Sequence, residues 1–226
     1  DLERGWAQSY DYSFSATADP REAAKFGVIQ LGFYAGDTWN VSDTVSLNYG
    51  LRLDIPILPD NPTYNATADD VFGVDTSNVP SGALLWSPRI GFNWDPGADG
   101  RQQVRGGIGM FSGRTPYVWL SNQYGNTGNE FTRISSYLSR PINAGNNIPF
   151  VADPLNQPTD VGNASTNEVD VTDPDYHFPS VLRATIGYDR ELPWQNMTFT
   201  TEVIFAATHY DVYWESINIF PTGETV

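Results

Sequence analysis

Two neighbouring stretches of this sequence alternate apolar and polar residues, and this alternation restricts the possible folds more than any other feature. In 45–55 every odd-numbered residue is apolar, and every even-numbered residue is polar or glycine. The stretch 27–39 repeats the pattern almost as regularly. Successive side chains of a strand point to opposite faces, whereas a helix needs apolar residues three and four positions apart. The two predicted strands are therefore 27–39 and 43–55, joined as a hairpin through 40–43.

Four later stretches follow the same period of two, although Ile204 falls among the polar residues of the last one. These stretches are 86–95, 102–112, 180–189 and 197–207. The predicted fold class is all-β, with the six strands antiparallel and adjacent in sequence order. Each run is close to the roughly 9–11 residues that a tilted strand needs to cross a bilayer. We therefore expect part of an antiparallel transmembrane β-barrel.

Short and long connections alternate along the predicted sheet. The short ones are 40–43, 96–101 and 190–196, and the long polar loops are 56–85 and 113–179. Transmembrane barrels have this asymmetry, with short periplasmic turns and long extracellular loops. Trp39, Trp94 and Trp194 all lie beside short connections, where a periplasmic aromatic girdle is expected.

The arginines of the predicted strands fall on the polar face, opposite an apolar face that we expect to point outward. The arginines expected to face the lumen are Arg52, Arg89, Arg105 and Arg183. The apolar residues expected to face outward are Leu47, Leu51, Leu53, Ile90, Phe92, Ile108, Leu182 and Ile186. An arginine on the lipid face at mid-depth would cost about 2–4 kcal/mol, which favours this orientation.

Composition narrows the classes of function. A net charge of −15 argues against nucleic acid as a partner, because the chain has no basic stripe to replace phosphate counterions. With two separated histidines and no cysteine, neither a zinc site nor a Cys/His nucleophile is expected. No pair of carboxylates at strand ends suggests a glycosidase, so we expect no enzyme and no cofactor. The acidic run with Asp170, Asp173 and Asp175 is either a solvated loop or a calcium site.

Several motifs resemble those of TonB-dependent outer-membrane receptors. They are FYAGDTW at 33–39, LNYGLRLD at 47–54, WSPRIGFNWD at 86–95 and VRGGIGMF at 104–111. RTPYVWLSN at 114–122 and GYDRELP at 187–193 are similar to the Oar-like subgroup, which carries a carboxypeptidase-regulatory-like domain before its plug. The resemblance extends over most of 26–220.

This resemblance implies a barrel of about twenty-two strands in the bacterial outer membrane. Outer-membrane lipid and lipopolysaccharide would surround the barrel, and the TonB system would act through a plug. No stretch of this sequence corresponds to a plug or to a carboxyl-terminal strand, so we interpret residues 1–226 as a central barrel fragment of six or seven strands.

Such receptors capture a ligand for import, or handle an exported polypeptide, on the extracellular side. The candidate ligand-binding residues follow the fourth predicted strand: Arg114, Tyr117, Trp119, Asn122, Tyr124 and Asn126. Aromatic and arginine side chains concentrate binding energy when partly buried. The alternative is that this segment packs the upper barrel.

A second class of function is also open: a secreted, soluble β-sandwich that binds carbohydrate, with the apolar face as its core.

Overall fold

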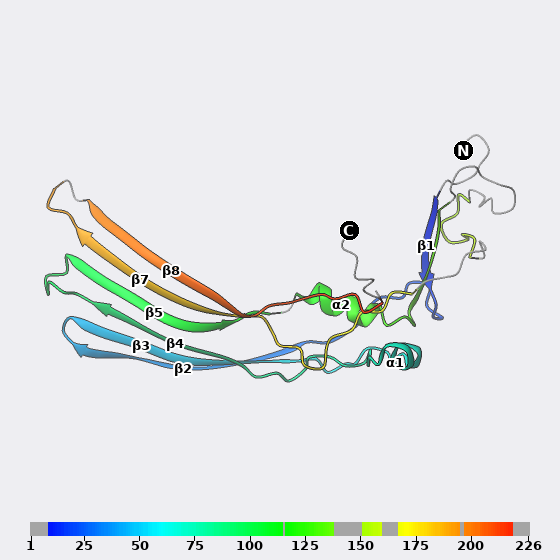
Figure 1. The fold of residues 1–226 in the computed structure, drawn as a ribbon, viewed down its shortest axis with the longest axis horizontal. Helices are drawn as coiled ribbons and strands as arrows, with labels where there is room; N and C mark the ends of the chain where they lie inside the picture. The colour runs from blue at the N-terminus through cyan, green and yellow to red at the C-terminus, as the bar shows by residue number, and fades with distance from the viewer. Residues whose placement is uncertain (1–8, 115, 138–150, 160–166, 195–196, 219–226) are drawn as a thin grey trace, which may run out of the picture. The chain divides into compact units, whose positions relative to one another are not determined.

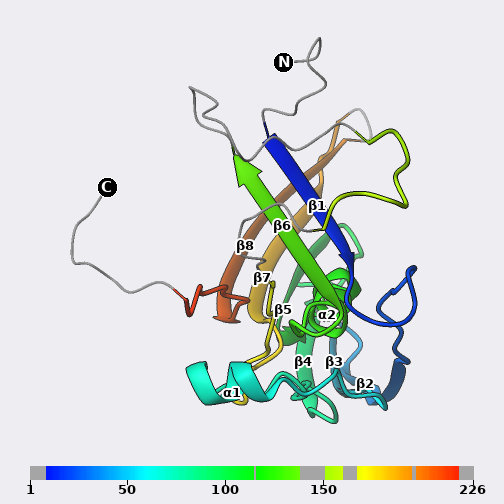
Figure 2. The ribbon, with the colours of Figure 1, turned by 90° about the vertical axis from the view of Figure 1, so that its right-hand side faces the viewer.

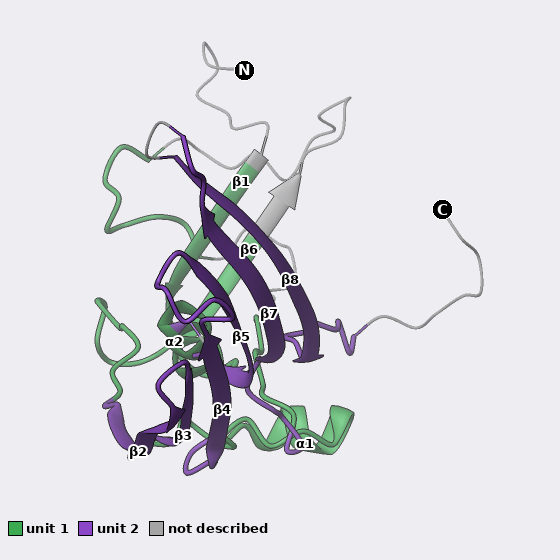
Figure 3. Ribbon diagram, turned by 90° about the vertical axis from the view of Figure 1, so that its left-hand side faces the viewer, with its two compact units in different colours: residues 1–26, 60–79, 117–173 green, residues 27–59, 80–116, 174–226 purple. Residues whose placement is uncertain are grey.

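The computed structural model describes residues 9–114, 116–137, 151–159, 167–194 and 197–218. The chain divides into two compact units, shown in different colours in Figure 3. Unit 1 comprises residues 1–26, 60–79 and 117–173, and unit 2 comprises residues 27–59, 80–116 and 174–226. Unit 2 thus contains the alternating stretches, and unit 1 contains most of the two long connections.

Unit 2 is a six-stranded antiparallel sheet with the order β2-β3-β4-β5-β7-β8 (Figure 1). Its strands are β2 (Ile29–Ser42), β3 (Val45–Ile57), β4 (Leu85–Trp94), β5 (Gln102–Ser112), β7 (Ser180–Glu191) and β8 (Thr198–Tyr210). The six strands predicted from the alternation are confirmed, and they are neighbours in sequence order. Two outer strands, β2 and β8, border the sheet.

The turn between β2 and β3 is tighter than the sequence indicated. Asn40, Val41 and Ser42 continue β2, and only Asp43 and Thr44 lie between the two strands. The predicted connection at 40–43 was therefore too long. The register shifts between Asn40 and Ser42, which accommodates one extra residue there as a bulge does. From Asn40 opposite Ser46, the pairing continues without a shift to Ile29 opposite Ile57.

The turn between β4 and β5 is held by the side chain of Asp95. Its two carboxylate oxygens accept hydrogen bonds from the backbone N–H groups of Gly97 at 3.1 Å and Gly100 at 2.8 Å. Gly100 has a φ of 74°, a left-handed conformation that suits glycine. The Pro-Gly-Ala-Asp-Gly sequence of this connection therefore forms the short turn that its chemistry predicts.

Unit 1 is built from segments that lie far apart in the sequence. Its elements are β1 (Ser9–Ser15), α1 (Ala66–Phe72), α2 (Tyr117–Gly125) and β6 (Phe131–Tyr137). β1 and β6 lie side by side as an antiparallel pair, with Tyr12 opposite Ile134 (Figure 2). The expectation that 56–85 and 113–179 are loops was therefore incomplete, because they contain two helices and a strand.

The core of unit 1 mixes a few apolar side chains with polar ones. Among the residues that the structure describes, Ala68, Leu120, Tyr124 and Ile134 are its buried hydrophobic residues. Its buried polar residues are Thr76, Gln123, Thr127 and Glu130. Every buried side-chain nitrogen or oxygen in the described residues has a hydrogen-bond partner, as expected when polar groups leave water. Hydrogen bonds therefore take a large part in holding these segments together.

None of the helices in the described part of the chain is long and apolar enough to cross a membrane.

Candidate functional site

The strand register places all eight predicted apolar residues on one face of unit 2. Leu47 lies opposite Phe92 and Ile90 lies opposite Ile108, and residues opposite each other in a sheet share a face. Leu51, Ile90, Ile108 and Ile186 are 44%, 49%, 47% and 54% exposed. In a β-sandwich this face would form a buried core. Its exposure instead matches a surface that contacts lipid, and it does not favour the carbohydrate-binding sandwich.

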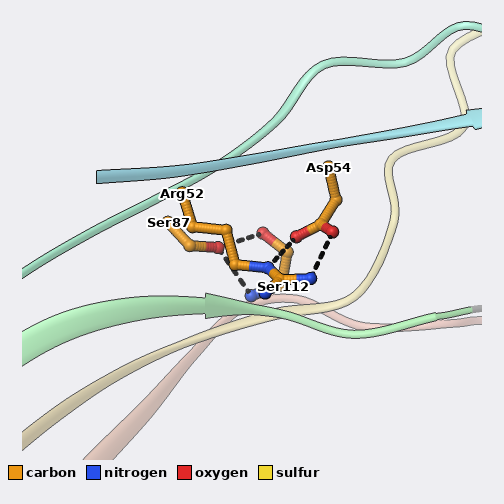
Figure 4. A network of polar contacts seen from close by, with 4 residues as sticks. All are labelled: Arg52, Asp54, Ser87 and Ser112. Carbon is orange, nitrogen blue, oxygen red and sulfur yellow. Dashed lines mark hydrogen bonds and ion pairs between the residues drawn. The ribbon is translucent and has the colours of Figure 1, made fainter. Parts of the chain in front are cut away.

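The register also places the four predicted arginines on the opposite, polar face, and two of them are paired with acids. Arg52 donates to both carboxylate oxygens of Asp54, from Nε at 2.6 Å and from Nη2 at 2.8 Å (Figure 4). Arg105 forms an ion pair with Asp189, and its Nη2 lies 3.9 Å from Oε2 of Glu202. These pairs neutralise both guanidinium groups within the wall.

The other two arginines, Arg89 and Arg183, form no hydrogen bond or ion pair with any described residue. Both line a hollow of about 720 Å³ on unit 2. Glycines of β4 and β5 and the polar side chains of Asn48 and Thr185 also line it. The sequence did not reveal this hollow as a site.

The predicted ligand-binding residues after β5 fall into two groups. Tyr117 and Asn122 are exposed on α2, and Trp119 is half-buried. Arg114 is also exposed, but it belongs to unit 2.

The remaining two, Tyr124 and Asn126, are part of the internal structure of unit 1. The Tyr124 ring stacks on Phe26 with centroids 4.5 Å apart, and its hydroxyl donates to the carbonyl oxygen of Asp60. Asn126 Nδ2 donates to a carboxylate oxygen of Asp170 at 2.9 Å. Both side chains therefore make contacts within unit 1, and a ligand-binding role for them stays a prediction.

A network around Thr127 was missed by sequence reasoning. Both the backbone N–H and the hydroxyl of Thr127 donate to Oε2 of Glu130, at 3.0 and 2.7 Å. Asn65 donates from Nδ2 to the Thr127 carbonyl oxygen at 2.8 Å, and its Oδ1 accepts from the first turn of α1. The sequence did contain a signal for α1. Asparagine is favoured just before a helix and glycine just after it, and Asn65 and Gly73 stand at these two positions around the seven helical residues.

A family model described as the outer membrane beta barrel domain matches residues 8–219. The chain belongs to this outer membrane β-barrel family. No curated protein and no solved structure matches the chain. As a member of the family, the protein is located in the bacterial outer membrane.

Aromatic side chains at both ends of the apolar face agree with this family. On β4, Trp86 and Trp94 share the apolar face, eight positions apart. Eight residues of strand extend over about 26 Å, which corresponds to about 20 Å of height at a tilt of about 40°. This approaches the apolar band of about 25 Å in outer-membrane barrels. Trp39 and Trp194, both 57% exposed, flank other short connections.

The calcium prediction gains no support from the residues that the structure describes. Among them, no group of three or more His, Cys, Asp or Glu side chains is placed to hold a metal ion. Asp170 uses a carboxylate oxygen for Asn126, and Asp175 belongs to a different unit from Asp170 and Asp173. A solvated loop stays the prediction for this acidic run, with calcium as its alternative.

Proposed function

We propose that this chain forms part of the wall and the extracellular region of a TonB-dependent receptor of the Oar-like subgroup. In this account the protein is not an enzyme. It captures a ligand for import or handles an exported polypeptide, in contact with outer-membrane lipid and lipopolysaccharide. The TonB system would act through a plug region that none of the described residues provides. The sequence motifs at 33–39, 86–95 and 114–122 support the receptor class.

One observation carries the proposal: the long connections form an organised unit rather than simple links. The segments 60–79 and 117–173 join strand ends on the side opposite the short turns, which in this family is the extracellular side. Long loops that fold into a compact structure are usually functional. Buried side chains such as Leu120 and Gln123 hold α2 in place, so that Tyr117 and Asn122 are presented on a supported helix.

Depletion of solutes from a complex growth medium tests the receptor class even while the ligand is unidentified. Cells with and without the protein, each with and without functional TonB, are compared by mass spectrometry of the spent medium. If the protein imports its ligand, at least one solute is consumed only when both the protein and TonB are present. If it handles an exported polypeptide, a polypeptide reaches the medium only when both are present. Identical media from all four strains would contradict the proposal.

Alanine substitution then tests where the ligand binds. Tyr117→Ala and Trp119→Ala in the protein at its natural length are expected to reduce consumption of that solute. Tyr213→Ala is the matched control, because it removes an exposed tyrosine of unit 2. Unchanged consumption in correctly folded Tyr117→Ala and Trp119→Ala variants would leave α2 with a packing role only.

A further inference from the structure

The two unpaired arginines of the polar face lie in one cross-strand row. Arg89 on β4 is opposite Gly109 on β5, which is in turn opposite Arg183 on β7. Two strand spacings separate the arginine Cα atoms by about 10 Å. Gly109 between them carries no side chain, and a Cβ there would lie 3.0 Å from Cβ of Arg89. The Arg89 side chain extends toward β3, where its Nε would lie 3.5 Å from a Cβ at Gly50, and Arg89 and Arg183 both line the same hollow.

In the next cross-strand row, two glycines leave the sheet surface bare, and two polar residues add hydrogen-bond donors. Gly91 and Gly107 are opposite each other, with Asn48 on one side and Thr185 on the other. The Thr38 hydroxyl donates to Oδ1 of Asn48 at 2.8 Å. Because this bond uses the acceptor oxygen of the amide, Nδ2 of Asn48 remains a donor toward the hollow.

The hollow formed by these rows has the size of a small-molecule site. Its volume of about 720 Å³ lies within the range of about 300–1,000 Å³ that is usual for ligand pockets. Asp37 is the one carboxylate among its lining residues. Its Oδ1 accepts from the backbone of Thr38 at 2.7 Å, and its register partner is Tyr49 on the apolar face. The donors of the polar face therefore outnumber the anionic groups around the hollow.

The two arginines of this hollow differ from the other two arginines of the same face in their acidic partners. Arg52 and Arg105 each have acidic partners, whereas Arg89 and Arg183 have none among the described residues. This occurs in a chain with 27 acidic and 12 basic residues. Acids are thus abundant, and yet none in the described part of the chain is placed to neutralise these two arginines.

The geometry points to a binding site for a small oxyanion with at least two negative charges, a dicarboxylate or a phosphate, held between Arg89 and Arg183. A guanidinium binds carboxylate and phosphate oxygens in a bidentate way, and two such groups match a doubly charged anion. Asn48 and Thr185 add hydrogen bonds from the adjoining row. The site belongs to the barrel wall, and its existence does not depend on which ligand α2 captures or on TonB.

Isothermal titration calorimetry of the protein, purified from outer membranes in detergent, tests this site with succinate and inorganic phosphate as probes. At least one probe is expected to bind, and the tighter one identifies the class of anion. Arg89→Gln and Arg183→Gln are each expected to weaken binding about tenfold or more. Arg183→Lys keeps the charge but not the bidentate geometry, so it should retain more affinity than Arg183→Gln.

Arg101→Gln is the matched control, because it removes the same charge from the exposed turn after β4. It should change the affinity less than twofold. Neither Arg89 nor Arg183 has a described partner to lose, so both variants should fold, and circular dichroism and heat-modifiable mobility in gels check this. Absence of binding by both probes would overturn the proposal. Equal weakening by Arg101→Gln, or unchanged affinity in Arg89→Gln and Arg183→Gln, would overturn it as well.

Discussion

Asn65 donates a hydrogen bond of 2.8 Å from its side-chain amide to the carbonyl oxygen of Thr127, a residue 62 positions further along the chain. The same side chain accepts from the backbone N–H groups of Thr67 and Ala68 at 3.0 and 3.1 Å, and so caps α1. One residue thus begins a helix in the first long connection and joins it to the second. This link is one reason why unit 1 forms a single structure.

Asn65→Ala is therefore expected to loosen unit 1 and to leave the sheet of unit 2 intact. The loss of the cap and of the bond to a buried residue should cost about 1–3 kcal/mol. Limited proteolysis measures it as faster cleavage within 60–79 and 117–137. Asn156→Ala is the control, since that exposed amide bonds only locally, to Asp153. Equal cleavage rates in both variants would show that the link has no such role.

The hydroxyl of Tyr124 should affect the stability of unit 1 at high pH. Burial, followed by the negative charge of Asp60, raises the pKa of Tyr124 above its ordinary value of 10.0. A tyrosine whose pKa is raised on folding stabilises fully below the unfolded pKa, and this contribution is lost as the pH rises through the folded pKa.

Tyr124→Phe keeps the stack on Phe26 but removes the titrating hydroxyl and its bond to the Asp60 carbonyl. We expect a loss of about 0.5–1.5 kcal/mol at neutral pH and a flatter decline of stability above a pH of about 10. Hydrogen exchange of α2 amides as a function of pH measures both effects. Parallel pH profiles for the wild type and Tyr124→Phe would contradict this assignment.

The pairing of β1 with β6 should weaken in acid. Arg133 donates to both carboxylate oxygens of Asp11, at 3.0 and 2.5 Å, and these bonds lower the pKa of Asp11. A depressed carboxyl pKa contributes stability above the unfolded pKa, and this contribution is lost as the pH falls through the folded value. Asp11→Asn should therefore increase amide exchange in β6 at neutral pH and make no difference at strongly acidic pH. A difference that persists in acid would point to another cause.

The sheet was predictable because its pattern is local. The alternation at 45–55 shows both the strand and its two faces, and the register between Tyr49 and Ile90 then follows from keeping apolar residues on one side. Ile204 is the exception that the sequence indicated, since it lies opposite Thr185 on the polar face of the outer strand β8. The boundary at 40–43 was wrong because a bulge depends on backbone geometry rather than on polarity.

Unit 1 was not predictable to the same degree, because its contacts are distant in sequence. β1 pairs with a strand that begins at Phe131, and each of the two strands is only seven residues long. Tyr117 and Tyr124 look equivalent in the sequence, yet the first is exposed and the second is buried against Phe26. Arg89 and Arg183 were correctly placed on the polar face, whereas their lack of described partners became visible only from the positions of the surrounding acids.

The central claim is that the apolar face of unit 2 contacts lipid and the polar face contacts water, and single spin labels test it most directly. The chain has no cysteine, so each introduced cysteine carries the only label. Tyr49→Cys and Ile186→Cys probe the apolar face, and their sequence neighbours Asn48→Cys and Thr185→Cys probe the polar face. In the membrane-embedded protein, labels at 49 and 186 should collide mainly with oxygen, and labels at 48 and 185 mainly with an aqueous nickel chelate. Labels at 49 and 186 that are shielded from both reagents, or that collide mainly with the nickel chelate, would contradict the account.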